Sequence, residues 1–169
     1  MEQLLKKHKR CDEFLINALN DPEIKSFLPD GVIVECLTCE AEAFFSTTTN
    51  SIGICANNIL PFQSIFNHAL KHEAVHAKDF KYFQSFSDPC LFRACTEIRA
   101  NKFSGQCSSL IRDFMRVALP DFKACVYKLA KISHDSAPSC KSKPSVDLMW
   151  DFCFNSELDQ DLSQAESKE

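Results

Sequence analysis

The sequence lacks a long apolar run, since none reaches the roughly 18 residues that suggest a membrane-spanning helix. Its N-terminal segment also lacks the apolar core of a secretory signal. The acidic residues Glu2, Asp12 and Glu13 make it a poor match to an Arg-rich, acid-poor transit peptide. We therefore expect a cytosolic protein or one that reaches its compartment by another route.

A basic surface for nucleic acid is also missing. The formal net charge is −4 at pH 7, and the one basic cluster, at residues 6–10, is typical of a solvated helix face. With 169 residues, 45% hydrophobic and 25% charged, the composition is that of a globular protein. We expect one domain over residues 1–155, then an acidic, disordered tail over residues 156–169.

Cysteine, in contrast, is abundant, with ten residues in the chain. In an oxidising compartment such a number indicates disulfides, and in a reducing one it indicates metal or redox chemistry. Composition alone does not separate these two interpretations.

The spacing of apolar residues predicts an α+β fold that is mostly helical. Helical periodicity covers residues 2–20, and Asp21-Pro22 is typical of the start of a second, short helix. Short apolar segments over residues 32–34, 43–45 and 52–55 predict a small antiparallel sheet of two or three strands. Further helices are expected at about residues 61–83, 90–103, 107–118, 120–133 and 146–154.

The motif H-E-x-x-H at residues 72–76 lies within one of these expected helices. On a helix, His72 and His76 project from one face with Cβ atoms roughly 5–6 Å apart, so both imidazoles can bind one Zn²⁺. Glu73 is then placed to act as the general base for an attacking water. The alternative is a solvated helix that carries two histidines and an acid by chance.

A catalytic zinc site usually has three protein ligands, so a further residue is needed. Glu97 is the favoured third ligand, because a helix-turn-helix return can bring its long side chain back to the metal. Asp79 is placed about 10 Å along the helix axis from His72, too far for a short side chain, and is expected to hydrogen-bond a ligand such as His76. The alternatives are a surface acid for Glu97 and an ion-pair partner for Asp79.

The remaining histidines are weaker candidates. His68 lies one turn before His72, where a third helical ligand would close the site, so we interpret it as structural. His8 and His134 have no supporting neighbours in the sequence.

Two longer stretches carry a family resemblance: H-E-A-V-H-A-K-D at residues 72–79 and A-C-T-E-I-R-A-N-K-F-S-G-Q-C at residues 94–107. Together they resemble the mitochondrial inner-membrane metalloprotease family that matures and assembles the membrane sector of ATP synthase. That family carries H-E-x-x-H-x-x-D and then C-x-E-I-R-A-x-x-x-S-G-x-C. Shorter stretches also align, so the resemblance covers most of residues 11–155: C-L-T-C at 36–39, I-C-A-N-N at 54–58, A-C-V at 124–126 and C-F-N at 153–155.

The resemblance implies a zincin-like metalloprotease domain that holds one catalytic Zn²⁺ and cleaves a protein or peptide substrate. An ATP synthase membrane-sector subunit is the implied partner. The implied location is the mitochondrial inner membrane, peripherally on the intermembrane-space side, with the nucleus or cytosol as alternatives. Two other functions are implied as alternatives: an assembly chaperone that acts without proteolysis, and a DNA-repair-associated, Ku-binding-like relative. No nucleic-acid partner is expected.

The resemblance also implies that the cysteines are mainly disulfide-bonded, because the intermembrane space is oxidising. Eight of the ten fall on family-like positions: Cys11, Cys36, Cys39, Cys55, Cys95, Cys107, Cys125 and Cys153. A structural zinc on Cys36 and Cys39 is the alternative.

The chain departs from the family pattern at residues 40–45, where a glycine-rich stretch is replaced, and at residues 101, 102 and 106. If an edge strand at 40–45 pairs with extended substrate, the change alters specificity.

Overall fold

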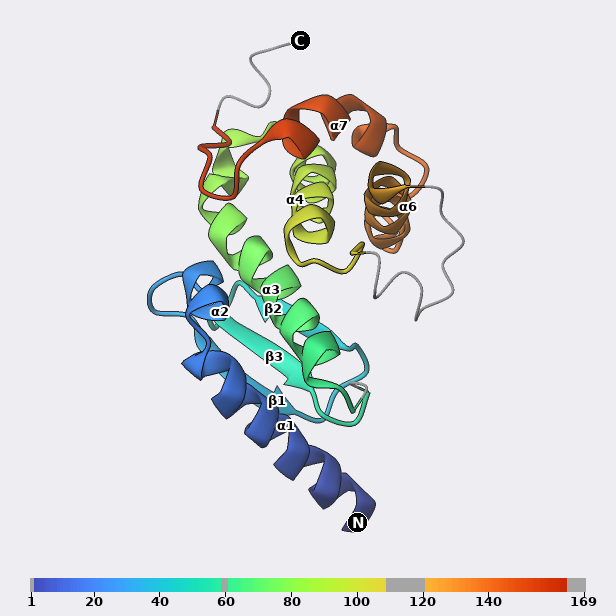
Figure 1. Ribbon diagram of the computed structural model, residues 1–169. Coiled ribbons are helices and arrows are strands. Elements are labelled where there is room, and N and C mark those ends of the chain that lie inside the picture. The colour runs from blue at the N-terminus through green and yellow to red at the C-terminus, as the bar shows by residue number, and fades with distance from the viewer. Residues whose placement is uncertain (1, 59–60, 109–120, 164–169) are drawn as a thin grey trace. The chain divides into compact units, whose positions relative to one another are not determined.

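The computed structural model describes residues 2–58, 61–108 and 121–163 (Figure 1). Two compact units make up the chain, Met1–Lys78 and Asp79–Glu169, and each is described by itself. The predicted single domain over residues 1–155 stays a prediction. Most of the helix expected at 107–118 lies outside the described residues.

The described part of the first unit contains three helices and three strands, and their order follows the predicted one closely. The elements are α1 (Glu2–Asn20), α2 (Pro22–Phe27), β1 (Ile33–Leu37), β2 (Ala43–Ser46), β3 (Ser51–Cys55) and α3 (Gln63–Asp79), whose last residue already belongs to the second unit. Helix α2 starts as expected, because the Asp21 side chain accepts a hydrogen bond of 2.8 Å from the Glu23 backbone N–H and Pro22 occupies the first turn.

The sheet corrects one expectation, since it is mixed and not antiparallel. Its strand order is β1-β3-β2, with β2 antiparallel to β3 and β1 parallel to β3. Strand β3 pairs with β2 as a local hairpin and also inserts beside β1, so the two strands that flank it run in opposite directions. Alternating apolar residues indicate strands, but they carry no information about which strand lies between the other two.

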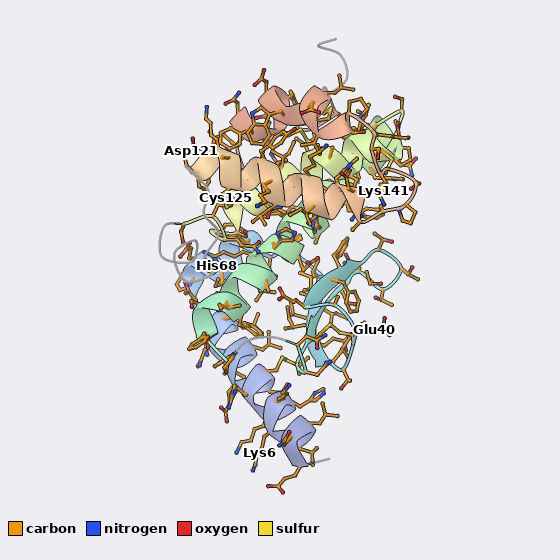
Figure 2. All side chains as sticks on the ribbon, turned by 90° about the vertical axis from the view of Figure 1, so that its right-hand side faces the viewer. Lys6, Glu40, His68, Asp121, Cys125 and Lys141 are labelled. Atoms are coloured by element: carbon orange, nitrogen blue, oxygen red, sulfur yellow. A yellow bond between two sulfur atoms is a disulfide. The ribbon has the colours of Figure 1, made fainter. Side chains whose placement is uncertain are left out.

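Helices cover one face of this sheet. Figure 2 shows α1 and α3 on the same side of the three strands. Ile52 and Ile54 of β3 are fully buried. A disulfide between Cys11 and Cys36 joins α1 to β1, and the rings of Phe14 in α1 and Phe66 in α3 meet edge to face at 5.8 Å. The core of the first unit therefore lies between the sheet and these two helices.

The described part of the second unit is helical. Its elements are η1 (Phe80–Ser85), α4 (Pro89–Phe103), α6 (Phe122–Asp135) and α7 (Ser145–Asn155). The last three lie close to the predicted ranges, whereas the helix expected over 61–83 ends at Asp79 and is followed by the short 3-10 helix η1. Asp88 caps α4 by accepting a hydrogen bond of 2.8 Å from the Cys90 backbone N–H. Gly105 follows this helix at φ +78°, a left-handed conformation that glycine adopts readily.

The segment after α7 contradicts the expectation of a disordered tail as far as it is described. Leu162 is fully buried and joins the core that α4, α6 and α7 form. The Arg99 guanidinium of α4 donates to the backbone carbonyls of Glu157 at 2.8 Å and Leu158 at 2.7 Å. Ser156 and Leu162 are therefore packed into the second unit, while other residues of this segment are exposed. The polar composition of the segment does not reveal these buried contacts. Residues 164–169 lie outside the described residues.

All ten cysteines form disulfides. Two pairs lie in the first unit, Cys11–Cys36 and Cys39–Cys55. Three lie in the second: Cys90–Cys140, Cys95–Cys153 and Cys107–Cys125. The alternative of a structural zinc on Cys36 and Cys39 is wrong for this state of the chain, because each sulfur is bonded to a different cysteine. The two cysteines that match no family position, Cys90 and Cys140, pair with each other.

Within the described residues, no helix combines the length and the apolar character needed to cross a membrane.

Candidate metal centre

Helix α3 carries the H-E-x-x-H motif and is anchored at several points along its length. Near its start, the Gln63 side-chain amide donates to the Phe14 backbone carbonyl of α1 at 3.0 Å. Eight residues further on, Lys71 forms an ion pair of 2.5 Å with Glu23 of α2 and lies over the Phe27 ring. These contacts attach α3 to α1 and α2, and the second of them lies at the residue directly before the motif.

The apolar stripe of α3 lies on a different side from the two histidines. Phe66, Leu70 and Ala74 recur every four residues and are fully buried. At 3.6 residues per turn, His72 and His76 lie on a face roughly opposite this stripe. Packing thus fixes one side of the helix and leaves the histidine face half-buried.

His72 and His76 lie together as their spacing predicts. Their ring centroids are 4.8 Å apart with an interplanar angle of 78°, and one nitrogen of each ring lies within 4.8 Å of the other. Glu73 occupies the next position after His72 and is also half-buried. Two imidazoles one turn apart, with a carboxylate beside them and access for water, are a donor set that suits Zn²⁺. The residues present on α3 therefore fit the expected metal.

Glu97 lies in the second unit, on the buried part of α4, with 6% of its surface exposed. Arg93, one turn earlier, places a guanidinium nitrogen 3.7 Å from a carboxylate oxygen of Glu97. The alternative of a surface acid is wrong, because the side chain is buried. Its role as third ligand stays a prediction.

Asp79 forms a buried ion pair with Arg99. The Arg99 Nε donates to both carboxylate oxygens, at 2.9 and 3.2 Å, and the two side chains are 1% and 0% exposed. The salt-bridge interpretation of Asp79 therefore holds. The hydrogen bond to a histidine ligand, which sequence reasoning favoured, stays a prediction.

The other histidines have separate environments. His8 pairs with the Thr38 hydroxyl at 2.8 Å, and His68 is half-buried in α3, one turn before His72. His134 is fully buried and lies close to the sulfurs of Cys90 and Cys140. Sequence reasoning missed this group because its members are up to fifty residues apart and share no motif.

The segment that departs from the family pattern leads into an edge strand. Strand β2 lies at one edge of the sheet, and the loop before it is held by two asparagines of the I-C-A-N-N stretch. Asn57 bonds both backbone groups of Cys39, at 3.2 and 3.0 Å. Asn58 donates to the carbonyls of Cys39, Glu40 and Ala41 at 2.6–3.0 Å. Pairing of this edge with substrate stays a prediction.

One protein family and several of its named relatives match this chain. The profile of the Peptidase M76 family matches residues 1–158. The chain is 38% identical over 94 residues to the mitochondrial inner membrane protease ATP23 of Meyerozyma guilliermondii. This alignment covers 51% of this chain and 38% of that protein. It is 29% identical over 147 residues to the protein of the same name from Lodderomyces elongisporus, covering 83% and 58%. It is 30% identical over 166 residues to that of Neosartorya fischeri, covering 86% and 69%.

The matched part of this chain spans about half the length of the first two relatives, 38% and 58%. No solved structure matches the chain.

Proposed function

This chain belongs to the Peptidase M76 family, and we propose that it is a zinc-dependent endopeptidase whose centre is built on α3. The observation that carries the proposal is the placement of His72 and His76 on one face of an anchored helix, with Glu73 beside them. The family match spans this helix.

In this proposal His72 and His76 hold the ion and Glu97 supplies the third ligand. The carboxyl group of Glu97 is buried, and nearby positive charge stabilises its ionised form. Arg93 supplies some of that charge at 3.7 Å, and a metal cation would supply more. Three ligands leave the open position that a catalytic site needs.

The chemistry divides between the ion and Glu73. A bound Zn²⁺ would polarise the scissile carbonyl and stabilise the negative charge that develops on its oxygen. Glu73 takes a proton from the attacking water and then gives it to the departing amine. The half-burial of Glu73 leaves it accessible to water while the helix holds its direction.

We further propose a protein substrate in the intermembrane space. The relatives are named mitochondrial inner membrane proteases, and five disulfides favour an oxidising compartment. The family resemblance points to the precursor of an ATP synthase membrane-sector subunit as substrate, and to peripheral attachment at the inner membrane. Protease protection and carbonate extraction of the tagged protein test the location.

The decisive test is Glu73→Gln in the purified chain. We expect zinc content and fold to be unchanged and the rate of peptide cleavage to fall by about 10²–10⁴-fold, the usual contribution of a general base. Glu13→Gln, on the exposed surface of α1, is the matched control and should cleave normally. Full cleavage by the Glu73→Gln protein would overturn the mechanism.

The third ligand is tested by zinc content. Glu97→Ala should lose zinc, whereas His68→Ala, one turn from the motif, should retain it. Loss of zinc in Asp79→Ala but not in Glu97→Ala would show that the assignment is wrong.

An assembly role without proteolysis remains the alternative. Rescue of a deletion strain by the Glu73→Gln form would favour that role, and failure to rescue would favour proteolysis.

A further inference from the structure

A second cluster of metal-ligating side chains lies wholly within the second unit and shares no residue with the motif on α3. Cys90 is in the first turn of α4, His134 is in the last turn of α6, and Cys140 is in the turn that follows α6. Lys141, labelled in Figure 2, marks this turn. The two sulfurs and a nitrogen of the His134 ring all lie within 4.8 Å of one another. All three residues are at most 3% exposed.

The surroundings of His134 leave one ring nitrogen available as a ligand. Nδ1 lies 2.9 Å from Oδ1 of Asp135, and because an ionised carboxylate only accepts hydrogen bonds, Nδ1 is the donor. In the neutral imidazole, the form that binds metals, Nε2 is then an acceptor, and it is buried with no hydrogen-bond partner among the described residues. A carboxylate that holds one nitrogen of a histidine while the other binds a metal is the usual arrangement around histidine ligands.

We propose that reduction of the Cys90–Cys140 disulfide creates a Zn²⁺ site held by the two thiolates and Nε2 of His134. Two sulfurs and one imidazole are typical zinc donors, at about 2.3 Å for sulfur and 2.0–2.1 Å for nitrogen. Around a tetrahedral ion these lengths place the donor atoms roughly 3.5–3.8 Å apart. Donor atoms that already lie within 4.8 Å of one another need only small movements to reach this arrangement.

The redox step requires a thiol reductant, here glutathione. Its thiolate attacks Sγ of Cys140, forming a mixed disulfide, and the sulfur–sulfur bond to Cys90 breaks with Cys90 leaving as a thiolate. A second glutathione thiolate then attacks the glutathione sulfur of the mixed disulfide and releases Cys140. Two electrons pass to the protein, oxidised glutathione is the product, and the two thiol protons of glutathione end on the cysteines. Zinc binding then displaces both protons to solvent.

The position of the two cysteines favours this order of events. Cys90 is the second residue of α4, and a thiolate at a helix N-terminus is stabilised, which makes it the better leaving group. Cys140 is flanked by the exposed residues Ser139 and Lys141, so a local opening of this turn exposes its sulfur. In the described part of the chain, no other disulfide forms such a close group with a histidine.

The inference is tested by equilibrating the full chain in glutathione buffers of graded ratio, with and without added Zn²⁺. Thiols are then trapped by alkylation and each cysteine is quantified by mass spectrometry. At a free zinc concentration of 100 Kd, the thiol–disulfide equilibrium of Cys90–Cys140 should shift toward the dithiol by about 100-fold. The other four disulfides are internal controls and should not shift.

Variants of the same chain identify the ligands. His134→Gln should abolish the zinc-dependent shift, and Asp135→Asn should weaken zinc binding by about 10–100-fold. His8→Gln is the matched control and should behave like the unmodified chain. The shift should persist in the His72→Ala/His76→Ala double variant, which separates this site from the proposed protease centre.

Cobalt gives an independent readout, even if the His134→Gln protein fails to fold. Co²⁺ bound to the reduced, unsubstituted chain should produce a sulfur-to-cobalt charge-transfer absorption that a histidine–carboxylate site cannot produce. An equal zinc effect on all five disulfides, no effect on any, or no charge-transfer band would each overturn the proposal.

Discussion

Arg99→Met should strongly destabilise the second unit. The Arg99 side chain is fully buried and bonds both oxygens of Asp79, the Ser156 hydroxyl and the carbonyls of Glu157 and Leu158. Arg99 of α4 therefore binds both Asp79 and the segment that follows α7.

The magnitude follows from the chemistry of these bonds. Removing one partner of a buried ion pair typically costs about 3–5 kcal/mol, because the other charge stays buried. Methionine fills part of the volume but replaces none of the hydrogen bonds, so we expect a loss of about 4 kcal/mol. With a urea dependence of about 2 kcal/mol per M, the unfolding midpoint should fall by about 2 M.

Urea unfolding with intact disulfides provides the assay, followed by circular dichroism and by the fluorescence of Trp150. This residue is the single tryptophan of the chain and lies in α7, stacked on Phe154 at 4.8 Å, so its emission reports on the second unit. Lys128→Met, on the exposed side of α6, is the matched control and should change stability by less than about 0.5 kcal/mol.

A double-mutant cycle separates the ion pair from the other bonds of Arg99. The Arg99→Met/Asp79→Asn double variant should be more stable than the sum of the single losses predicts, by about 0.5–3 kcal/mol. If Arg99→Met were no more destabilising than Lys128→Met, this account of the second unit would be wrong.

Three further predictions concern contacts within the individual units. Leu162→Ala should lower the free energy of unfolding by about 2–5 kcal/mol in the same urea assay, because the side chain is fully buried, whereas Leu148→Ala on the exposed side of α7 should change it little. The Cys11→Ser/Cys36→Ser double variant should lose about 3 kcal/mol, the value for closing a loop of this size, and a much smaller loss would show that the link between α1 and β1 is unimportant. Asp88→Ala should lower the free energy of unfolding by removing the cap of α4, measured in the same urea assay. The pKa of Asp88 is lowered because its carboxylate accepts a hydrogen bond from the Cys90 N–H and one from Lys143, so the cap stabilises the fold above about pH 4. That stability is lost as pH falls through the lowered pKa, and the difference between the Asp88→Ala and unmodified proteins should shrink there.

The sequence by itself determined the features that depend on neighbouring residues. Helix boundaries follow from apolar periodicity and from capping signals such as Asp21-Pro22 and Asp88-Pro89, which act within one turn. The placement of His72 and His76 on one face of α3 belongs to the same class, because a spacing of four residues on a helix determines it.

Only the tertiary structure decided which distant segments meet. It placed β3 between β1 and β2, which hydrophobic patterns do not specify, and it paired cysteines that are 16 to 58 residues apart. Cysteine spacing allows many pairings, and the chain folding selects one by bringing two sulfurs within bonding distance.

The same limit applies to buried charge and to the tail. Asp79 and Arg99 are twenty residues apart, so no local pattern indicated their ion pair, and Leu162 lies in a polar segment whose composition favoured a disordered end. Burial is a property of all the segments around a residue, and it appears only when those segments are packed. For that reason His134, Cys90 and Cys140 became a candidate site only once α4, α6 and the turn after α6 were in place.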